Sequence, residues 1–396
     1  MRFVPLLLTT GLAPTVALHV LPQRQLIAVN SSFGDLRSVL GHADREDFEA
    51  IFHDHVVVWA NQSQMAELEH FRVPFREVDN DAYNNFLKHR RQPYHDEEGR
   101  EPNWGRYCGY NCLSERLRAL ARDGGCEFPL ELQSIGSSCE DRHIWAVKVG
   151  RTGPEVLMAA NIHGNEPVGG QLLQRWLWST CRKPDASQVE VAKSVQAWYV
   201  LMLNPDGFEQ HSRWNAAGAD LNRDMPTPHG GSASQPETRA LVSFEEQHAF
   251  VSALMFHGGA MVCNTPYDSC YAPVVSRPCP PALAGDDTLI TANSRAYCDP
   301  LMASGGMCSF GTDCQTNGAS WYQIEGSVQD YEYFYRGTLS VTMEIWPEKF
   351  PPSSDLPALY TVNQQSIHNF MMFAVEHAKE VHPRGLHATQ EAAEHP

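Results

Sequence analysis

The feature that most constrains the fold of this chain is a series of short apolar runs separated by segments with a helical pattern. Apolar runs without polar alternation are typical of strands buried on both faces of a sheet. Strands that alternate with helices favour a mostly parallel sheet covered by helices. The sequence therefore predicts an α/β fold with a mixed, mostly parallel central sheet and helices on both faces. The predicted strands are 144–149, 156–162, 198–203, 251–256 and 339–345, and the predicted helices are 168–178, 236–248, 287–297 and 356–378.

The chain of 396 residues divides near residue 90. Residues 18–91 contain no cysteine, and a predicted helix at 62–71 lies between predicted strands at 55–59 and 73–78. This pattern indicates a small α+β unit ahead of the main domain, which we place at residues 104–382.

Polar segments follow each of these two parts. Residues 92–103 are typical of an exposed linker, and residues 383–396 form a polar tail. The basic run Lys88-His89-Arg90-Arg91 precedes the linker. It is as consistent with cleavage by a processing protease as with a linker that is never cut.

The beginning of the chain is typical of a secretory signal. Residues 1–17 carry one charge, Arg2, then an apolar run and small residues at Thr15 and Ala17. This order predicts a signal peptide and a secreted protein, and a buried N-terminal strand is the alternative. No later stretch has the roughly 18 apolar residues needed to span a bilayer.

Net charge and cysteine content indicate which cellular compartment and which binding partners are compatible with this sequence. The chain has 30 Lys and Arg against 47 Asp and Glu, a formal net charge of −17, which argues against nucleic-acid binding. All 11 cysteines lie between Cys108 and Cys314, which favours disulfides in an oxidising compartment. Because the number is odd, at least one thiol is free or pairs between chains. Cys108 and Cys112 favour a disulfide over half a metal site, since no second close pair follows at zinc-finger spacing.

Two histidines and two glutamates come at the ends of predicted strands. Strand 156–162 runs directly into His163-Gly164-Asn165-Glu166, strand 251–256 is followed by His257, and Glu344 lies near the end of strand 339–345. The carboxyl ends of parallel strands form the active-site edge of such folds. Two His and one Glu are a sufficient set of protein ligands for a catalytic zinc ion with one open position. The pattern predicts one zinc ion per chain at His163, Glu166 and His257, with Glu344 as a candidate base.

Two arginines flank the loop after strand 198–203. Arg213 comes ten residues before Arg223, which ends the segment Asp220-Leu221-Asn222-Arg223. Guanidinium groups hold carboxylates through paired hydrogen bonds better than ammonium groups do. The two arginines are therefore candidates for binding a substrate carboxylate in the same crevice.

Six spaced segments of the chain resemble the zinc metallocarboxypeptidases. They occur in that family's order over about residues 104–380 and are most similar to the branch that includes carboxypeptidases N, E, D and M, whose members remove C-terminal Lys or Arg. The segments are His163-Gly164-Asn165-Glu166, Leu203-Asn204-Pro205-Asp206-Gly207, Asp220-Leu221-Asn222-Arg223, Phe256-His257-Gly258-Gly259, Thr316-Asn317-Gly318-Ala319-Ser320-Trp321-Tyr322, and Glu344 followed by Glu348-Lys349-Phe350-Pro351-Pro352.

The resemblance implies a role for each matched position. It implies zinc ligands at His163, Glu166 and His257, with Glu344 as general base. It also implies that Arg213 polarises the scissile carbonyl and that Asn222 and Arg223 bind the terminal carboxylate of the substrate. Tyr322 matches a mobile tyrosine that closes over the substrate, and Asp268 and Gln329 match residues that line the pocket for the last side chain.

The residues and the resemblance together predict a secreted zinc exopeptidase that removes the C-terminal residue, Lys or Arg, from peptides or proteins. One alternative is a zinc hydrolase of small N-acyl amino acids. Another is a non-catalytic zinc- or peptide-binding protein on the same scaffold. Glu344 argues against a pure binder, which needs no base, and Arg213 with Asn222 and Arg223 argues for peptide C-termini.

Two features depart from the resembled branch. Residues 18–91 faintly resemble the inhibitory prosegment of the digestive branch, which implies a zymogen. The family usually has Asn and Phe after the Asn-Arg pair, whereas this chain has Asp224 and Met225. We expect this second departure to change the crevice near the carboxylate site.

Overall fold

The computed structural model describes residues 25–30, 36, 48–51, 55–77, 101–122, 124–270, 284–306, 308–309 and 313–381. The predicted signal peptide 1–17, most of the linker 92–103 and the tail 383–396 lie outside these residues. The domain boundaries drawn from the sequence therefore stay predictions.

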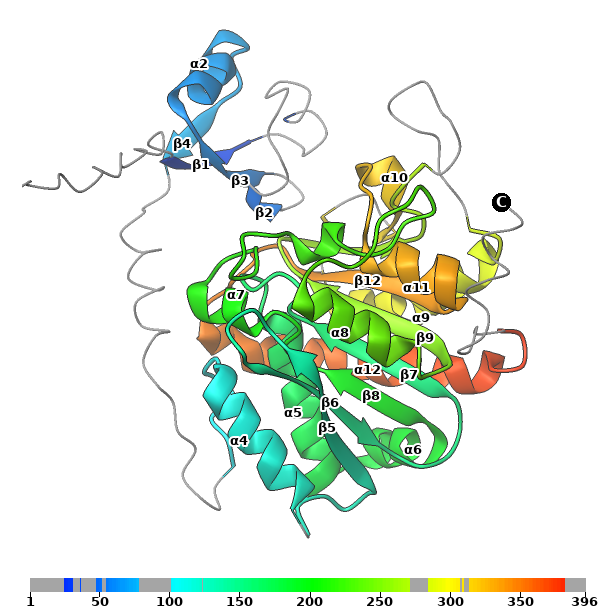
Figure 1. Ribbon diagram of the computed structural model, residues 1–396. Helices are drawn as coiled ribbons and strands as arrows, with labels where there is room; N and C mark the ends of the chain where they lie inside the picture. Colours follow the sequence, from blue (N-terminus) through cyan, green and yellow to red (C-terminus); the bar gives the residue numbers. More distant parts are fainter. Residues whose placement is uncertain are drawn as a thin grey trace, which may run out of the picture.

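A mixed sheet forms the centre of the main domain (Figure 1). Its strands within the described residues are β5 (Leu130–Ser137), β6 (His143–Val149), β7 (Glu155–Ala160), β8 (Gln196–Val200), β9 (Phe250–His257), β10 (Ala260–Thr265), β11 (Gln315–Asn317) and β12 (Leu339–Trp346). They lie in the order β11-β10-β12-β9-β7-β8-β6-β5. The central strands β8, β7, β9 and β12 pair in parallel, as do β10 and β11, and the β5–β6, β6–β8 and β10–β12 pairs are antiparallel. The mostly parallel sheet predicted from the sequence is confirmed.

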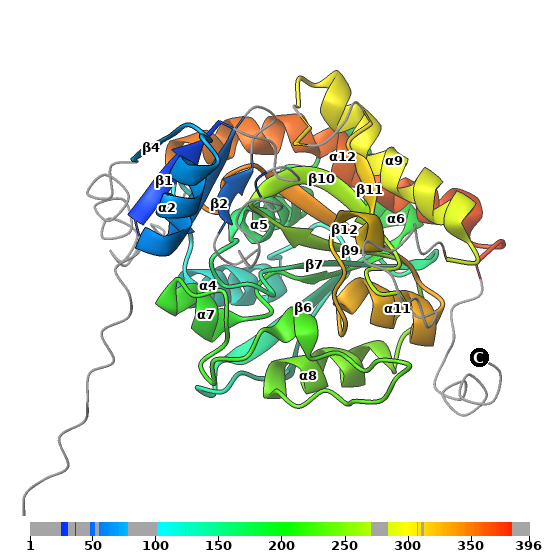
Figure 2. The ribbon, with the colours of Figure 1, turned by 90° about the horizontal axis from the view of Figure 1, so that it is seen from above.

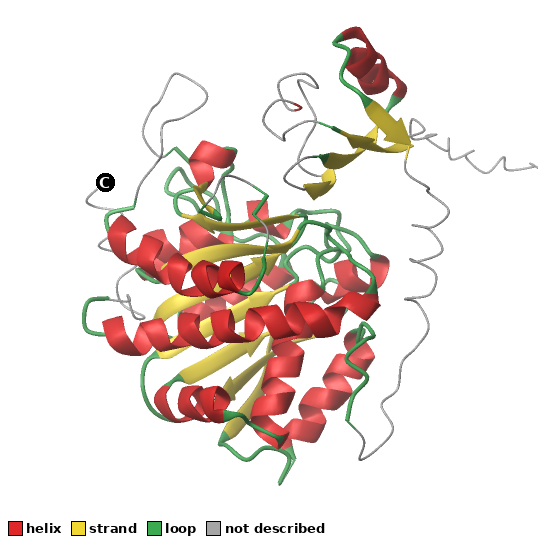
Figure 3. Cartoon of the chain, turned by 180° about the vertical axis from the view of Figure 1, so that it is seen from behind, coloured by secondary structure: helices red, strands yellow, loops and turns green. Residues whose placement is uncertain are grey.

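Helices cover both faces of this sheet. Along β7, Val156, Met158 and Ala160 pack in one apolar core, and Leu157 and Ala159 pack in the other. This alternation follows from the two-residue period of a strand. The first core includes α4 (Tyr110–Ala121), α5 (Val168–Arg182), α6 (Ala186–Ser194), α9 (Asp287–Ala303) and α12 (Leu356–His377), the layer in front of the sheet in Figure 3. The second includes α8 (Pro236–Glu245) and α11 (Val328–Arg336).

The predicted strands and helices of the main domain all exist, with ends that shift by a few residues. Strand 198–203, for example, is the shorter β8, because the chain turns before Asn204, which caps α7 (Pro205–Gln210) with its side chain. The edge strand β5 was missed because half-buried and exposed positions mix along it, so it has no apolar run.

The N-terminal residues form a separate antiparallel sheet of the order β2-β3-β1-β4. Its elements are β1 (Gln25–Val29), β2 (Phe48–Ile51), β3 (Val56–Ala60), α2 (Gln62–His70) and β4 (Phe75–Glu77). Their apolar side chains share one core with Ala260 and Val262 of β10, so this unit lies against the edge region of the main sheet, as Figure 2 shows. We call residues 25–77 of the described chain the N-terminal unit.

The prediction that most of the cysteines form disulfides is confirmed for the described residues. The described bonds are Cys108–Cys112, Cys126–Cys181, Cys263–Cys298 and Cys308–Cys314, and Cys270 is also disulfide-bonded. Cys139 is the free cysteine of the described residues. Among those residues no helix combines the length and the apolar character that crossing a bilayer requires.

Candidate active site

Three predicted metal ligands come together at the carboxyl edge of the central sheet. His163 and Glu166 lie in the turn after β7, and His257 is the last residue of the neighbouring strand β9. The Nδ1 atoms of the two imidazoles are 3.1 Å apart, and each lies 3.0 Å from Oε2 of Glu166. All three side chains are buried.

This donor set fits a zinc ion. Ligand bonds of about 2.0–2.1 Å in a tetrahedral site separate neighbouring ligand atoms by roughly 3.3 Å, close to the separations found here. Two imidazole nitrogens and one carboxylate oxygen converge on one point and leave room for a fourth ligand. The residues predicted from the sequence to bind zinc are therefore the residues that the fold brings together.

Asp220 orients this cluster, a role that the sequence did not reveal. Its Oδ1 lies 3.1 Å from Nε2 of His163, and its Oδ2 accepts hydrogen bonds from Nε and Nη2 of Arg213 at 3.0 and 2.8 Å. A carboxylate that accepts a hydrogen bond from Nε2–H of His163 keeps the proton on that nitrogen and leaves Nδ1 as the nitrogen that can bind a metal. Burial opposes ionisation of Asp220, but His163 and Arg213 outweigh it and hold the pKa of this carboxyl far below its usual range. The available signal was an acid two residues before the Asn222-Arg223 pair.

Arg213 lies directly beside the metal-ligand cluster. Its Nη1 is 3.0 Å from Nδ1 of His163 and 3.6 Å from Oε1 of Glu166. Burial lowers the pKa of this guanidinium, but the charges of Asp220 and Glu166 and the nearby Tyr322 reverse the shift and raise it. Arg213 therefore stays cationic in a buried position, where it can stabilise negative charge on a reacting group.

Glu344 lies on β12, next to the strand that carries His257. The two residues are register partners in this parallel pair, and Glu344 is buried. Register partners of neighbouring strands project from the same face of a sheet. The carboxylate of Glu344 is therefore held at the same edge as the metal ligands.

Asn222 and Arg223 form one short turn of 3₁₀ helix that begins at Asp220. The backbone N–H of Asn222 donates to Oδ1 of Asp220 at 2.9 Å, and Oδ1 of Asn222 accepts from the N–H of Val328 at 2.9 Å. These bonds fix Asn222 with its amide nitrogen available for a ligand. The side chain of Arg223 is 30% exposed, so it is accessible to a ligand.

Asp268 lies in the loop after β10, Tyr322 follows the short helix α10 (Gly318–Trp321), and Gln329 lies in the first turn of α11. The backbone N–H of Asp268 donates to Asp330 at 2.8 Å, and Ile324 N–H donates to the carbonyl of Asp268 at 3.1 Å. Oδ1 of Asp268 accepts from Asn264 at 2.8 Å, and Gln329 is fully buried.

Two glycines allow these motifs to approach one another. A Cβ at Gly318 would lie 1.9 Å from Oδ1 of Asp268, so the segment before Tyr322 reaches the acid only with glycine at this position. A Cβ at Gly164 would lie 2.0 Å from the backbone of Gly207, so the His163 turn and the Asn204 loop also need glycine to pack.

The departure at Asp224 affects a loop away from the metal ligands. Its carboxylate accepts hydrogen bonds from Ser234, Gln235 and Thr238 at the beginning of α8, and Met225 is buried in the core that faces α8. This pair therefore fixes the loop ahead of α8.

Comparison with known proteins assigns the chain to a family. Residues 126–366 match the family model of the zinc carboxypeptidases, Peptidase M14, and the chain belongs to this family. It is 32% identical over 272 residues to carboxypeptidase SOL1 of Arabidopsis thaliana, a match that covers 63% of this chain and 53% of that protein. It is 31% identical over 280 residues to carboxypeptidase M of Mus musculus, with 63% of this chain and 60% of the relative covered. The chain thus matches between about half and two thirds of the length of these relatives.

Solved structures share the fold. The crystal structure of thrombin activatable fibrinolysis inhibitor superposes with a TM-score of 0.70 at 16% identity and covers 89% of this chain and 99% of its own. Carboxypeptidase A from Helicoverpa armigera gives 0.71 at 14% identity, with 91% and 99% covered. Residues 104–382 make up about 70% of the chain, so both superpositions extend beyond the predicted main domain.

Proposed function

We propose that this chain hydrolyses the C-terminal residue of peptides or proteins. The observation that carries the proposal is the position of Glu344, which is in register with the metal ligand His257 and lies at the same sheet edge as His163 and Glu166. A carboxylate held beside a three-ligand metal site has the position that a general base requires. A protein that only bound zinc or peptide would have no use for it.

The reaction follows from the placement of these groups. His163, Glu166 and His257 would hold a zinc ion, which would act as a Lewis acid that lowers the pKa of a water molecule and polarises a carbonyl. Glu344 takes the proton of the attacking water and passes it to the leaving amine. Arg213, kept cationic and oriented by Asp220, donates hydrogen bonds to the oxygen that gains negative charge.

Exopeptidase specificity is assigned to Asn222 and Arg223. The accessible guanidinium of Arg223 and the amide of Asn222 match the two oxygens of a terminal carboxylate, which an internal peptide bond lacks. Tyr322, close enough to Arg213 to affect its pKa, closes over the bound chain end.

The pocket for the last side chain is assigned to Asp268 and Gln329. Both are buried, and the loop of Asp268 is bonded to the first turn of α11, where Gln329 lies. A buried carboxylate favours a cationic partner, so we propose that the removed residue is Lys or Arg.

The N-terminal unit is proposed as a prosegment of a secreted zymogen. Its β2 bonds to the segment after β12 through Ile51 N–H to Pro347 O at 3.1 Å and Lys349 N–H to Glu49 O at 3.2 Å. Its apolar core also packs against Trp321, the residue before Tyr322. The unit thus contacts both the segment that follows Glu344 and the residue next to Tyr322. The disulfides of the main domain support folding in an oxidising compartment.

The test is a panel of short peptides that differ only in the last residue, with products identified by mass spectrometry. We expect release of one residue per step, with Lys and Arg preferred, and no cleavage of peptides with an amidated C-terminus. Cleavage of amidated peptides at internal bonds would overturn the exopeptidase assignment. Hydrolysis restricted to N-acyl amino acids would favour the small-substrate alternative.

A further inference from the structure

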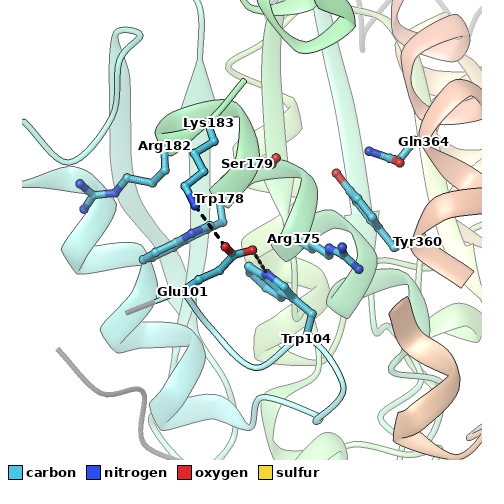
Figure 4. Close-up of a pocket in the computed structure, with 9 residues that line it drawn as sticks. All are labelled: Glu101, Trp104, Arg175, Trp178, Ser179, Arg182, Lys183, Tyr360 and Gln364. Atoms are coloured by element: carbon cyan, nitrogen blue, oxygen red, sulfur yellow. Dashed lines mark hydrogen bonds and ion pairs between the residues drawn. The ribbon is translucent and has the colours of Figure 1, made fainter. Parts of the chain in front are cut away.

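A second pocket lies outside the catalytic crevice, between the second half of α5, the helix α12 and the segment that leads from Glu101 into α4 (Figure 4). Its volume is about 150 Å³, whereas a single water needs about 15 Å³. Arg175 is seven residues beyond the first residue of α5, about 10 Å along the helix axis, whereas His163 and Glu166 of the metal-ligand cluster lie in the turn before that helix. The pocket is therefore separate from the proposed active site.

Positive charge is concentrated at this pocket, although the whole chain is acidic. Arg175, Arg182 and Lys183 line it, and Glu101 is the acid that lines it with them. The formal net charge of the chain is −17, so a local excess of cations is a distinct feature of this surface. Such an excess attracts anions.

The guanidinium of Arg175 lies between two aromatic rings. Its central carbon is 4.2 Å from the ring centroid of Tyr360 and 5.9 Å from that of Trp104. Among the residues that the structure describes, its buried Nη1 has no hydrogen-bond partner. The rings stabilise the positive charge but accept no N–H bond of ordinary strength, so a buried donor remains for an external acceptor.

The carboxylate of Glu101 is bound at the rim of the pocket by two donors. One of its oxygens lies 3.2 Å from Nζ of Lys183, and the other accepts from Nε1 of Trp104 at 3.3 Å. The bond from Lys183 lowers the pKa of Glu101. An anion that enters the pocket would bind Arg175, next to the carboxylate of Glu101.

We propose that this pocket, which Trp104 and Trp178 also line, binds an oxyanion, a carboxylate or sulfate group, through Arg175 and Lys183. The anion comes either from a free small molecule or from an acidic side chain of a bound peptide. This site does not depend on the proposed hydrolysis.

The test measures binding by isothermal titration calorimetry on the full chain at constant ionic strength. The probes are sodium sulfate and the blocked peptide acetyl-Glu-Glu-Glu-amide, whose amidated end offers no terminal carboxylate to Asn222 and Arg223. Saturable binding of sulfate identifies a free-anion site. Tighter binding of the peptide than of sulfate identifies an acidic segment as the ligand.

Two variants with opposite expected effects make the test specific. Arg175→Gln removes the unsatisfied donor and should weaken binding about tenfold or more. Glu101→Gln removes the competing carboxylate and should tighten binding about threefold, a gain that misfolding does not produce. Arg118→Gln, which changes a cation of α4 that lies over the ring of Trp145 on β6, is the matched control and should leave binding unchanged. Undiminished binding in Arg175→Gln, or no saturable binding of either probe, would overturn the proposal.

Discussion

His257 and Glu344 are register partners in the neighbouring parallel strands β9 and β12. His257 belongs to the metal-ligand cluster, and Glu344 is held next to it by the pairing of β12 with β9, so the sheet sets the separation between the metal ligand and the proposed base. Both strands are buried along almost all of their length, so the backbone pairing holds His257 and Glu344 rigidly relative to each other.

The role of Glu344 is tested by Glu344→Gln. We expect turnover to fall by about a hundredfold to ten-thousandfold, the usual contribution of a general base, while zinc remains bound. Steady-state rates and elemental analysis of the purified protein check both parts. Glu376→Gln, on the exposed face of α12, is the control. A variant that retains more than a few per cent of the rate would exclude Glu344 from the mechanism.

The role of Asp220 is tested by Asp220→Ala. Loss of the bond to Nε2 of His163 should weaken zinc binding about 10- to 100-fold, and loss of the bonds to Arg213 should lower kcat as well. Competition with a chelator measures the zinc affinity. Unchanged metal affinity would show that the hydrogen bond to His163 does not orient the ligand.

The preference for a basic last residue is tested by Asp268→Ala. We expect kcat/KM for peptides ending in Lys or Arg to fall about tenfold to a hundredfold, the worth of a charge-assisted hydrogen bond, and that for peptides ending in Leu to change little. Asp299→Ala, at an exposed acid on α9, is the control. An unchanged substrate profile would remove Asp268 from the pocket.

A buried pair of carboxyls predicts a pH dependence of stability. Burial raises the pKa of Glu332 on α11 to about 7, and burial together with Glu332 raises that of Glu245 on α8 well above its usual value. Native Glu332 keeps its proton at pH values where a glutamate with the ordinary pKa of 4.5 has lost it. Its contribution to the free energy of unfolding is therefore complete below the unfolded pKa and is lost as the pH rises through the folded one.

Glu332→Gln is the variant that isolates this effect, because Gln imitates the protonated acid. Its free energy of unfolding should exceed that of the wild type by an amount that grows from about pH 5 to about pH 8, to the order of 2 kcal/mol. Urea titrations at several pH values measure the difference in the free energy of unfolding between the two proteins, in which the pH effects of groups that do not interact with Glu332 cancel. A difference that does not change with pH contradicts the prediction.

Processing of the linker is tested by N-terminal sequencing of the secreted protein. If the basic run before the linker is cut, the mature chain should begin between residues 91 and 104. A chain that begins near Leu18 would contradict processing.

The sequence predicted those parts of the fold and of the site that depend on residues close together along the chain. His163, Glu166, His257 and Glu344 were found because each follows or ends an apolar run, and parallel strands bring such ends together. Asp220 was missed as a positioning residue, because its contact with His163 joins residues 57 apart in a loop without periodicity. The same holds for the pocket at Arg175, whose walls come from a linker end and two helices far apart in sequence.

If the N-terminal unit is the proposed prosegment, its lack of cysteine has a consequence for activation. Residues 18–91 contain no cysteine, so no disulfide would join this unit to the rest of the protein after a cut in the linker. The shared apolar core at Ala260 and Val262 would still hold the two pieces together. Cleavage of the linker and dissociation of the N-terminal unit would therefore be separate steps. Dilution of the cleaved protein should favour dissociation without further proteolysis.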